Sequence, residues 1–354
     1  MTPDFWRGRR VFVTGHTGFK GGWLSLWLQS LGAEVHGYAL TPPTEPNFFT
    51  VTNLQARLAR STIADIRDAA ALTQAMQTAR PDIVLHLAAQ PLVRYSYTAP
   101  VETYAVNVMG TVNLLEAVRQ SPTVKAVINV TTDKCYENRE WVWPYRENEA
   151  MGGFDPYSSS KACSELVTAA YRRSFLESVG IQLASARAGN VIGGGDWAVD
   201  RLVPDFLRAL DAGRTLTIRS PWATRPWQHV LEPLSGYLVL AEKLFTEGKS
   251  FAEAWNFGPE EVDAWPVQWI VDYLCSQVPG ATWQSDASPQ PHEANTLKLD
   301  SSKAKAQLGW RPRWNLQAAL GMTLAWHQAW RQGSDMAAFS VQQIQEYEVS
   351  ARQV

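Results

Sequence analysis

Residues 11–21 read VFVTGHTGFKG, and this stretch decides the fold. An apolar run of three residues leads into a glycine-rich turn, and a helical pattern of apolar residues through 23–31 follows directly. A turn of this kind between a strand and a helix is the setting that a dinucleotide-binding site requires. Gly15 would permit the tight turn, Gly18 would let the backbone approach a pyrophosphate, and Gly21 would allow close packing of helix on sheet. The N–H groups at the start of the helix would then face the phosphates.

The same alternation of short apolar strands and longer helical patterns continues to about residue 186. Strands that alternate with helices form parallel sheets, because a helix carries the chain back to the starting edge. Strands with continuous apolar runs are covered on both faces. The sequence therefore predicts an α/β fold, a Rossmann-type doubly wound parallel sheet. The expected strands after the first lie at 35–40, 61–63, 82–87, 126–130 and 182–186, and the later expected helices at 101–120 and 156–180.

Beyond about Gly189 the composition of the sequence and the spacing of its apolar segments change. Residues 193–195 are all glycine, and the later segments carry many prolines, tryptophans and arginines with less regular alternation. We expect residues 1–188 to form the dinucleotide-binding domain that carries the catalytic residues. We expect 189–334 to form a smaller C-terminal substrate-binding lobe. The polar stretch 335–354 is expected to be either a helical extension or a loose tail.

Charge and cysteine content narrow the class of protein. The chain of 354 residues has a formal net charge of −2, so it offers nucleic acid or an anionic membrane no electrostatic attraction. Cys135, Cys163 and Cys275 are scattered, which argues against a disulfide framework or a zinc site and fits a reducing compartment. Residues 1–10 lack the apolar run of a signal peptide, and no stretch is long and apolar enough to span a bilayer. We therefore expect a cytoplasmic protein that binds small molecules and no metal.

The end of the second expected strand bears on the choice of dinucleotide. An acidic residue usually stands there to bind the adenosine ribose. Residues 38–43 read YALTPP, with neither a carboxylate nor an arginine for a 2′-phosphate, so the strand leaves NAD and NADP both open. Asp65, after the third strand, could reach the adenine amino group, and the small residues in 87–90 would let the dinucleotide lie close. His16 and Lys20 in the turn could be exposed to solvent or could contact a phosphate.

Tyr157 and Lys161 form the pattern Y-x-x-x-K within the expected helix 156–180. Residues at i and i+4 share one helix face, so the ammonium could lie beside the same ligand as the phenol. A cation there would lower a tyrosine pKa that ordinarily lies near ~10 and would make the phenolate a general base. By itself the pattern more often marks an ordinary amphipathic pair. The motif TTDK at 131–134, together with the glycine-rich turn, favours the catalytic interpretation.

Three motifs together resemble the extended short-chain dehydrogenase/reductase superfamily, and within it the nucleotide-sugar 4,6-dehydratases. They are GHTGFKGGW at 15–23, TTDKCY at 131–136 and NVIGGGDW at 190–197, and the resemblance covers essentially the whole chain. The branches that act on dTDP-glucose and GDP-mannose usually carry an acidic residue where this chain has Lys134. That departure favours the branch that acts on CDP-glucose, with NAD as the implied cofactor.

The resemblance implies a reaction in which C4 of the hexose is oxidised, water is eliminated across C5–C6, and the hydride returns to C6. Tyr157 would deprotonate the C4 hydroxyl, and Lys161 would bind the nicotinamide ribose. Thr132 would hydrogen-bond to the C4 oxygen. Asp133 would be the acid that protonates the departing C6 hydroxyl. The product would be a 4-keto-6-deoxy sugar, used as a precursor of cell-surface polysaccharide such as the O-antigen of lipopolysaccharide.

The base that removes the C5 proton is left open. Lys134 could serve if neutral, although the neighbouring Asp133 favours the ammonium form. As a cation, Lys134 could instead polarise the C4 ketone and so acidify the C5–H bond. Glu137 is a possible substitute carboxylate, and its alternative is an ordinary loop position.

Family position also implies the binding residues and the assembly. For the nucleotide diphosphate they are Asn190, Arg201, Arg225 and His292. For the dinucleotide they are Gly15, Thr17, Gly18, Phe19, Lys20, Asp65, Ile66, Leu87, Ala88, Ala89, Gln90, Asn107, Thr131, Tyr157 and Lys161. The helices at 101–120 and 156–180 are expected to build a two-fold interface, which predicts a homodimer or homotetramer.

Two rival interpretations make different demands on the same motifs. A 4-epimerase or reductase on this scaffold would keep Thr132 and Tyr157 but would need no acid–base pair at 133–134. A catalytically silent protein that senses a dinucleotide would be expected to have lost Tyr157 or Lys161. All of these residues are present, which favours the dehydratase.

Overall fold

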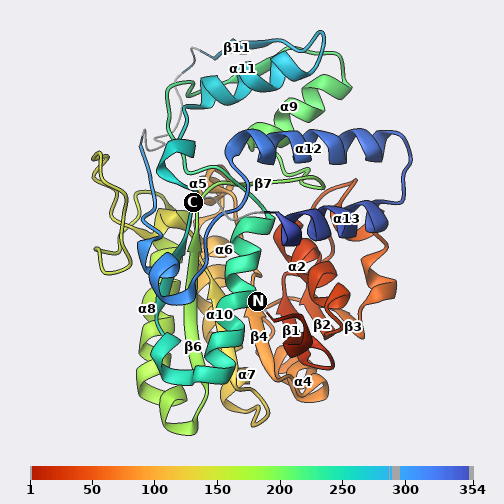
Figure 1. Ribbon diagram of the computed structural model, residues 1–354. Helices are drawn as coiled ribbons and strands as arrows, with labels where there is room; N and C mark the ends of the chain where they lie inside the picture. The colour runs from red at the N-terminus through yellow and green to blue at the C-terminus, as the bar shows by residue number, and fades with distance from the viewer. Residues whose placement is uncertain (1, 287, 289–295, 351–354) are drawn as a thin grey trace.

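The computed structural model describes residues 2–286, 288 and 296–350, and its centre is a seven-stranded parallel sheet (Figure 1). The strand order is β10-β6-β5-β4-β1-β2-β3, which confirms the predicted fold class. The order reverses between β1 and β4, and ligands of such sheets bind at this switch point, outside the carboxyl ends of the strands. The strands are β1 (Arg10–Thr14), β2 (Glu34–Ala39), β3 (Arg60–Ile63), β4 (Ile83–His86), β5 (Ala126–Val130), β6 (Gln182–Ala188) and β10 (Ala254–Phe257).

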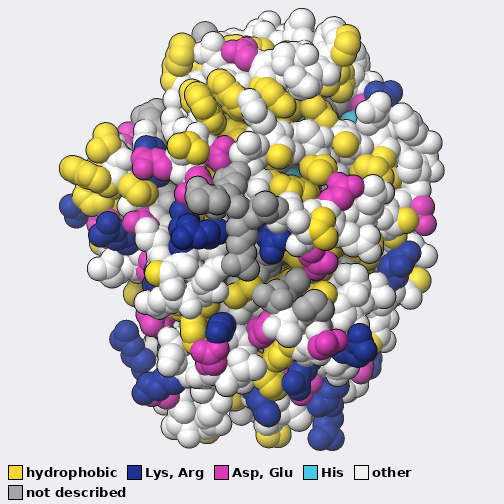
Figure 2. Space-filling model, viewed as in Figure 1, with side chains coloured by type: hydrophobic (Ala, Val, Ile, Leu, Met, Phe, Trp, Pro, Cys, Tyr) yellow, Lys and Arg dark blue, Asp and Glu magenta, His cyan; other side chains and the backbone are white. Residues whose placement is uncertain are grey.

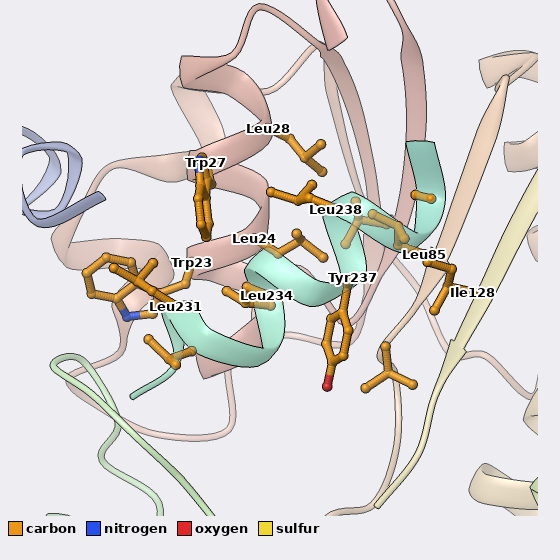
Figure 3. Packing of buried hydrophobic residues seen from close by; sticks show 14 of the residues in the cluster. Trp23, Leu24, Trp27, Leu28, Leu85, Ile128, Leu231, Leu234, Tyr237 and Leu238 are labelled. Carbon is orange, nitrogen blue, oxygen red and sulfur yellow. The ribbon is translucent and has the colours of Figure 1, made fainter. Parts of the chain in front are cut away.

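The alternation of side chains along each strand divides the apolar residues between two cores. Leu85 and Ile128 lie in one core with leucines of α2 and α10, as Figure 3 shows. Val84 and Val127 point to the other face and share a core with residues of α4 and α7. The covering helices are α2 (Phe19–Ser30), α4 (Ala69–Ala79), α7 (Gly110–Arg119) and α10 (Leu231–Glu247). Both faces of the sheet are therefore covered, as predicted.

The two long helices expected at 101–120 and 156–180 are present, but each contains a π-helical turn. Such turns are often found at functional sites. The first one carries Asn107, and the second helix ends at Gly180, whose φ of 79° suits glycine. The segments are α6 (Pro100–Tyr104), a π-helical turn (Ala105–Met109) and α7, then α8 (Pro156–Tyr171), a π-helical turn (Arg172–Leu176) and a 3-10 turn (Glu177–Val179).

A smaller lobe lies beyond the carboxyl end of the sheet (Figure 1). Its core joins residues such as Phe206, Ile270 and Leu320 from three helices. The chain after residue 189 is not confined to this lobe, because it also returns to supply α10 and β10 to the sheet. The elements of the lobe are α9 (Leu202–Asp211), α11 (Val267–Gln277), α12 (Leu316–Arg331), the pair β8 (Leu216–Ile218) and β11 (Trp283–Ser285), and the pair β7 (Val191–Ile192) and β9 (Gln228–His229).

The described part of the polar C-terminal stretch is a helix, α13 (Met336–Val349). It packs on α2, where the Trp27 indole donates a hydrogen bond to Glu348 at 2.8 Å and its ring lies 5.7 Å from that of Tyr347. Of the two expected alternatives, the helical extension is the one observed. The remaining short helices are α1 (Pro3–Trp6), α3 (Phe48–Val51), α5 (Val93–Thr98), the 3-10 turns Leu54–Arg57, Asp133–Cys135, Gly248–Phe251 and Glu261–Asp263, and the π-helical turn Ala304–Leu308.

Basic and acidic side chains are mixed over the face in view in Figure 2, consistent with the net charge of −2. Within the described residues, no helix combines the length and apolar character needed to cross a bilayer.

Candidate active site

The glycine-rich turn packs tightly between β4 and α2. Gly15 has a φ of 79°, and a Cβ there would lie 2.8 Å from the backbone nitrogen of Ala88. A Cβ on Gly21 would lie 2.0 Å from the Gly15 carbonyl oxygen, so neither position tolerates a side chain. Because α2 begins after Gly18, its first N–H groups face the turn. The turn therefore offers the backbone cradle that a dinucleotide pyrophosphate requires.

His16 and Lys20 are the two turn residues that the sequence leaves either exposed to solvent or in contact with a phosphate. His16 is fully buried, its Nε2 lies 2.7 Å from the Ser61 hydroxyl, and burial lowers its pKa to about 4. The solvent-exposed alternative is therefore wrong for His16, because the ring fills the space over Gly37. Lys20 donates a hydrogen bond to the Tyr237 hydroxyl at 3.1 Å. Burial and the nearby cations lower the pKa of Lys20 to about 7.

Asn107, Asp65 and Thr17, which were also predicted to contact the dinucleotide, make hydrogen bonds within the protein. Asn107 accepts a hydrogen bond from the Gln90 backbone N–H at 2.8 Å and donates to the Ser160 hydroxyl at 2.9 Å. The π-helical turn thus ties the end of β4 to α8. The Asp65 carboxylate is held by the Arg67 guanidinium at 2.5 Å, which lowers the pKa of Asp65. Thr17 turns away and donates to the Leu40 carbonyl at 2.8 Å.

A cavity of about 590 Å³ opens between the carboxyl ends of the strands and the smaller lobe. It brings together residues that are far apart in sequence. The predicted site residues that line it are Phe19, Lys20, Thr131, Thr132, Asp133, Lys134, Tyr157, Asn190, Arg201 and Arg225. Lys161 is buried and is not among the lining residues. Its Nζ donates to the Val130 carbonyl at 3.3 Å. Glu137 is not among the lining residues, and His292 falls outside the described residues.

Two further arginines line the cavity and were missed from the sequence. Arg94 and Arg219 both approach Asp200, at 3.5 and 3.0 Å. They come from separate segments, and each looks like an ordinary surface residue in the sequence, so no local signal could have found them. Arg201 pairs with the buried Asp196 at 2.8 Å. The arginines of the lining are therefore accompanied by aspartates, which offset part of their charge.

Asp133 has the environment of a proton donor. Its Oδ1 accepts a hydrogen bond from the Thr132 hydroxyl at 3.0 Å. Its Oδ2 is buried without a partner among the described residues. Burial raises the pKa of Asp133, although Lys134 and the Thr132 hydroxyl oppose the rise. The raised pKa favours the neutral acid, which is the form a general acid must have before it acts.

Tyr157 and Lys161 lie on α8, which begins at Pro156 with Asp155 as its N-cap. Burial raises the pKa of Tyr157 to about 12, and a hydrogen bond with Thr132 opposes this only in part. The predicted direction of the Tyr157 shift was therefore wrong. The reason is that Lys161 bonds to Val130 rather than to the phenol, while burial disfavours the phenolate. Burial also lowers the pKa of Lys161 to about 8.

The fold and the site define a class: a Rossmann-type enzyme of the short-chain dehydrogenase/reductase kind, in which Tyr157 and a TTDK segment line one cavity and Lys161 lies one helical turn further along α8. The chain belongs to the GDP-mannose 4,6 dehydratase family, whose model matches residues 12–323. A CDP-glucose 4,6-dehydratase of Salmonella typhimurium is 57% identical to it over 353 residues, which cover 98% of each chain.

Solved structures are similar at lower identity. A dTDP-glucose 4,6-dehydratase of Bacillus anthracis, in complex with NAD, matches with a TM-score of 0.75 at 20% identity, over 92% of this chain and 99% of that one. A UDP-glucose 4-epimerase of Thermus thermophilus, also a complex with NAD, matches with a TM-score of 0.77 at 24% identity, over 90% and 99%. At this level of identity, these likenesses support the fold.

Proposed function

We propose that this protein is a hydro-lyase that converts CDP-D-glucose to CDP-4-dehydro-6-deoxy-D-glucose. The observation that carries the proposal is the placement of Asp133, with its raised pKa, beside Tyr157 and Thr132 in one cavity. An oxidation alone, or an epimerisation at C4, has no use for a neutral acid at that place. The choice of the cytidine nucleotide rests on the 57% identical relative that carries this name.

The glycine-rich turn fits NAD, because the close approaches at Gly15 and Gly21 leave a bare backbone cradle at the start of α2. Bound NAD supplies the redox chemistry, since it can accept a hydride from C4 and return it at C6. The pyrophosphate would be held by the turn, and Asn107 would fix the backbone at Gln90 beside it. The preference for NAD over NADP rests on the family.

The protein's own residues handle the protons. Tyr157 would take the proton of the C4 hydroxyl, and Thr132, which bonds to both Tyr157 and Asp133, would hold the C4 oxygen between them. Because the Tyr157 phenol has a raised pKa, it needs a positive charge nearby to act as a base. Lys161 stands one helical turn further along α8 and would supply that charge. Asp133 would protonate the C6 oxygen as water leaves.

We propose that Lys134 promotes removal of the C5 proton. It follows Asp133 in the sequence, and both residues line the cavity. It would act either as a neutral base or as a cation that acidifies the C5–H bond. The diphosphate would lie beside Asn190, Arg201 and Arg225, which line the cavity. Guanidinium groups suit phosphate because their planar fork binds two oxygens. His292 remains a proposal from the family alone.

We also propose a homodimer or homotetramer that forms through α6, α7 and α8. Apolar side chains on these helices and on the π-helical turn between α6 and α7 are exposed, notably Val101 at 82%, Leu166 at 59% and Met109, in the turn, at 52%. Exposed apolar patches of this kind mark interaction sites. We further propose that the enzyme works in the cytoplasm and makes a deoxysugar precursor for O-antigen, with the lobe built from residues after 189 as the main substrate-binding part.

A panel of nucleotide-glucoses tests the substrate. The protein would be incubated with NAD and with CDP-, dTDP-, UDP- or GDP-glucose, and the alkali-sensitive absorbance of the 4-keto product would be followed. We expect the signal with CDP-glucose. Product NMR would distinguish a 4-keto-6-deoxy sugar from a C4 epimer, and an epimer or no product from any of the four would overturn the proposal.

A further inference from the structure

Glu165 is a buried acid on the same face of α8 as Tyr157 and Lys161. Tyr157, Lys161 and Glu165 stand at positions i, i+4 and i+8, so they share one helix face. The Glu165 carboxylate is only 4% exposed. Its Oε1 accepts a hydrogen bond from the Thr131 hydroxyl at 2.5 Å, and its Oε2 accepts from the Ser185 hydroxyl at 2.6 Å.

The partner of Glu165 is Arg187, on β6. The Arg187 Nη2 donates to Glu165 Oε2 at 2.8 Å. Its Nη1 donates to the Tyr136 hydroxyl at 2.8 Å and to the Glu147 carbonyl at 3.0 Å. Tyr136 in turn donates to Asn256 on β10 at 2.7 Å. The Glu165 and Arg187 ion pair is therefore the centre of a network that joins α8, β6 and β10 to the segment 131–136.

This network bonds to both ends of one short segment. Thr131 begins the segment 131–136 and is bonded to Glu165, while Tyr136 ends it and is bonded to Arg187. Thr132, Asp133 and Lys134 lie between these ends and line the cavity. The segment's own turn is held by two backbone hydrogen bonds of 3.4 Å, which are long. Its backbone is also tied to neighbouring segments, because the Thr131 N–H donates to the Ala186 carbonyl and the Cys135 carbonyl accepts from the Gly152 N–H, both at 2.9 Å. The ends of the segment are thus fixed by these bonds and by the network around Glu165 and Arg187.

We propose that Glu165 and Arg187 are positioning residues, which together clamp the segment 131–136 onto α8 and so set Asp133 against Tyr157. This inference rests on the proposed function, because it takes Asp133 to be the acid of that reaction. Neither Glu165 nor Arg187 lines the cavity, so the pair would act by holding Asp133 in place. Stability alone gives little reason for such a pair, because its desolvation roughly offsets its attraction. A fixed geometry does give a reason, because small displacements of catalytic groups slow a reaction strongly.

Removing Glu165 or Arg187 outright would leave an unpaired buried charge and could unfold the protein. The test therefore removes one hydroxyl at a time. Tyr136→Phe cuts the link between Arg187 and the segment, whereas Ser185→Ala removes a hydroxyl that is bonded to Glu165 but belongs to β6. Both hydroxyls are buried, so the two variants are matched in kind. Arg187→Lys is a second variant, which keeps the charge but loses the planar fork that reaches both Glu165 and Tyr136.

Amide hydrogen exchange of residues 131–136 would be measured together with kcat and KM for CDP-glucose. We expect Tyr136→Phe and Arg187→Lys to speed exchange in this segment and to lower kcat by roughly 10-fold or more, with KM nearly unchanged. We expect Ser185→Ala to leave both within about twofold of the wild type. Equal losses in Tyr136→Phe and Ser185→Ala, or unchanged exchange in Tyr136→Phe, would overturn the clamp.

The two readouts separate this inference from the function. If the wild-type protein turned over none of the nucleotide-glucoses, the proposed function would be wrong, while the exchange comparison would still decide whether the pair fixes the segment.

Discussion

At the scale of single residues, burial sets the proton chemistry of this site. It raises the pKa of Asp133, which favours the neutral acid. It also raises the pKa of Tyr157 to about 12 and lowers that of Lys161 to about 8. In each case burial disfavours the charged form of the group. To act as the proposed base, Tyr157 would therefore need a positive charge nearby.

Tyr157→Phe should lower turnover by at least ~10²-fold, the usual scale for the loss of a general base. Substrate affinity should change little, because the ring and its packing are retained. Steady-state kinetics with CDP-glucose would give kcat and KM separately. Near-normal turnover in this variant would remove Tyr157 from the mechanism.

Asp133→Asn should separate oxidation from elimination. The amide keeps the shape of the side chain but cannot protonate the C6 oxygen, so the reaction should stall after C4 is oxidised. Rapid mixing with substrate should then show an accumulating band of reduced nicotinamide, with little 4-keto-6-deoxy product. Normal product formation, or no band at all, would count against Asp133 as the acid.

At the scale of elements, the turn before α2 depends on close packing of backbone on backbone. A Cβ on Gly21 would lie 2.0 Å from the Gly15 carbonyl oxygen, too close to be relieved without moving the turn or the helix. Gly321, in α12, provides a matched helical glycine, because a Cβ there meets nothing within 4 Å. The two positions differ in surroundings rather than in secondary structure.

Gly21→Ala should therefore weaken NAD binding by 10-fold or more, roughly the effect of losing 1.4 kcal/mol. Gly321→Ala should leave NAD binding unchanged and should stabilise the fold by about 0.5–1 kcal/mol, since alanine loses less backbone entropy in a helix. Calorimetric titration with NAD and thermal unfolding of both variants would check this. Equal NAD affinity in both variants would contradict the assigned role of the turn.

One buried acid contributes to the docking of α13. Glu232, in α10, accepts hydrogen bonds from the Tyr347 hydroxyl at 2.7 Å and from the Trp314 backbone N–H at 2.8 Å. Burial nevertheless raises the pKa of Glu232 to about 7, from an ordinary value of 4.5. The Glu232 carboxyl is therefore protonated in the folded protein and ionised in the unfolded protein between pH 4.5 and about 7.

Because the folded-state pKa is raised, the stability that Glu232 contributes is fully present below pH 4.5 and is lost as pH rises through about 7. The free energy of unfolding of the wild type should decline over this window by up to roughly 3 kcal/mol. Glu232→Gln, which keeps the shape and an acceptor, should decline less over the same window. Denaturant titrations at several pH values would measure the difference, and parallel curves would rule out Glu232 as the source.

At the scale of the whole molecule, the candidate site lies between the carboxyl ends of the sheet and the smaller lobe. In the proposed reaction the hydride would leave C4 and return to C6, so NAD would end each turnover unchanged and would gain nothing by dissociating. The second strand ends without a carboxylate for the adenosine ribose, which should weaken the hold on NAD.

We therefore expect the protein to lose part of its NAD on purification, so that added NAD raises activity, and we expect only a modest preference over NADP. No net reduced nicotinamide should remain at the end of the reaction, whatever the sugar conversion. Absorbance at the reduced-nicotinamide band, followed alongside product yield, checks this. A stoichiometric build-up would indicate a simple dehydrogenase.

The sequence by itself determined the order of strands and helices along the chain, the glycine-rich turn and the placement of Tyr157 and Lys161 one turn apart on a single helix. These are local features: side-chain period, φ requirements and helix geometry act within a few residues. The family resemblance added the roles implied for Thr132 and Asp133, which the structure places in one cavity with Tyr157.

Only the tertiary structure decided which groups are buried and which charges meet. The rise in the Tyr157 pKa, the burial of His16 over Gly37, and the pairing of Glu165 with Arg187 all arise where separate segments pack together. Desolvation and Coulomb energy depend on distance in space and on exclusion of water. Neither quantity is encoded in the spacing of residues along the chain.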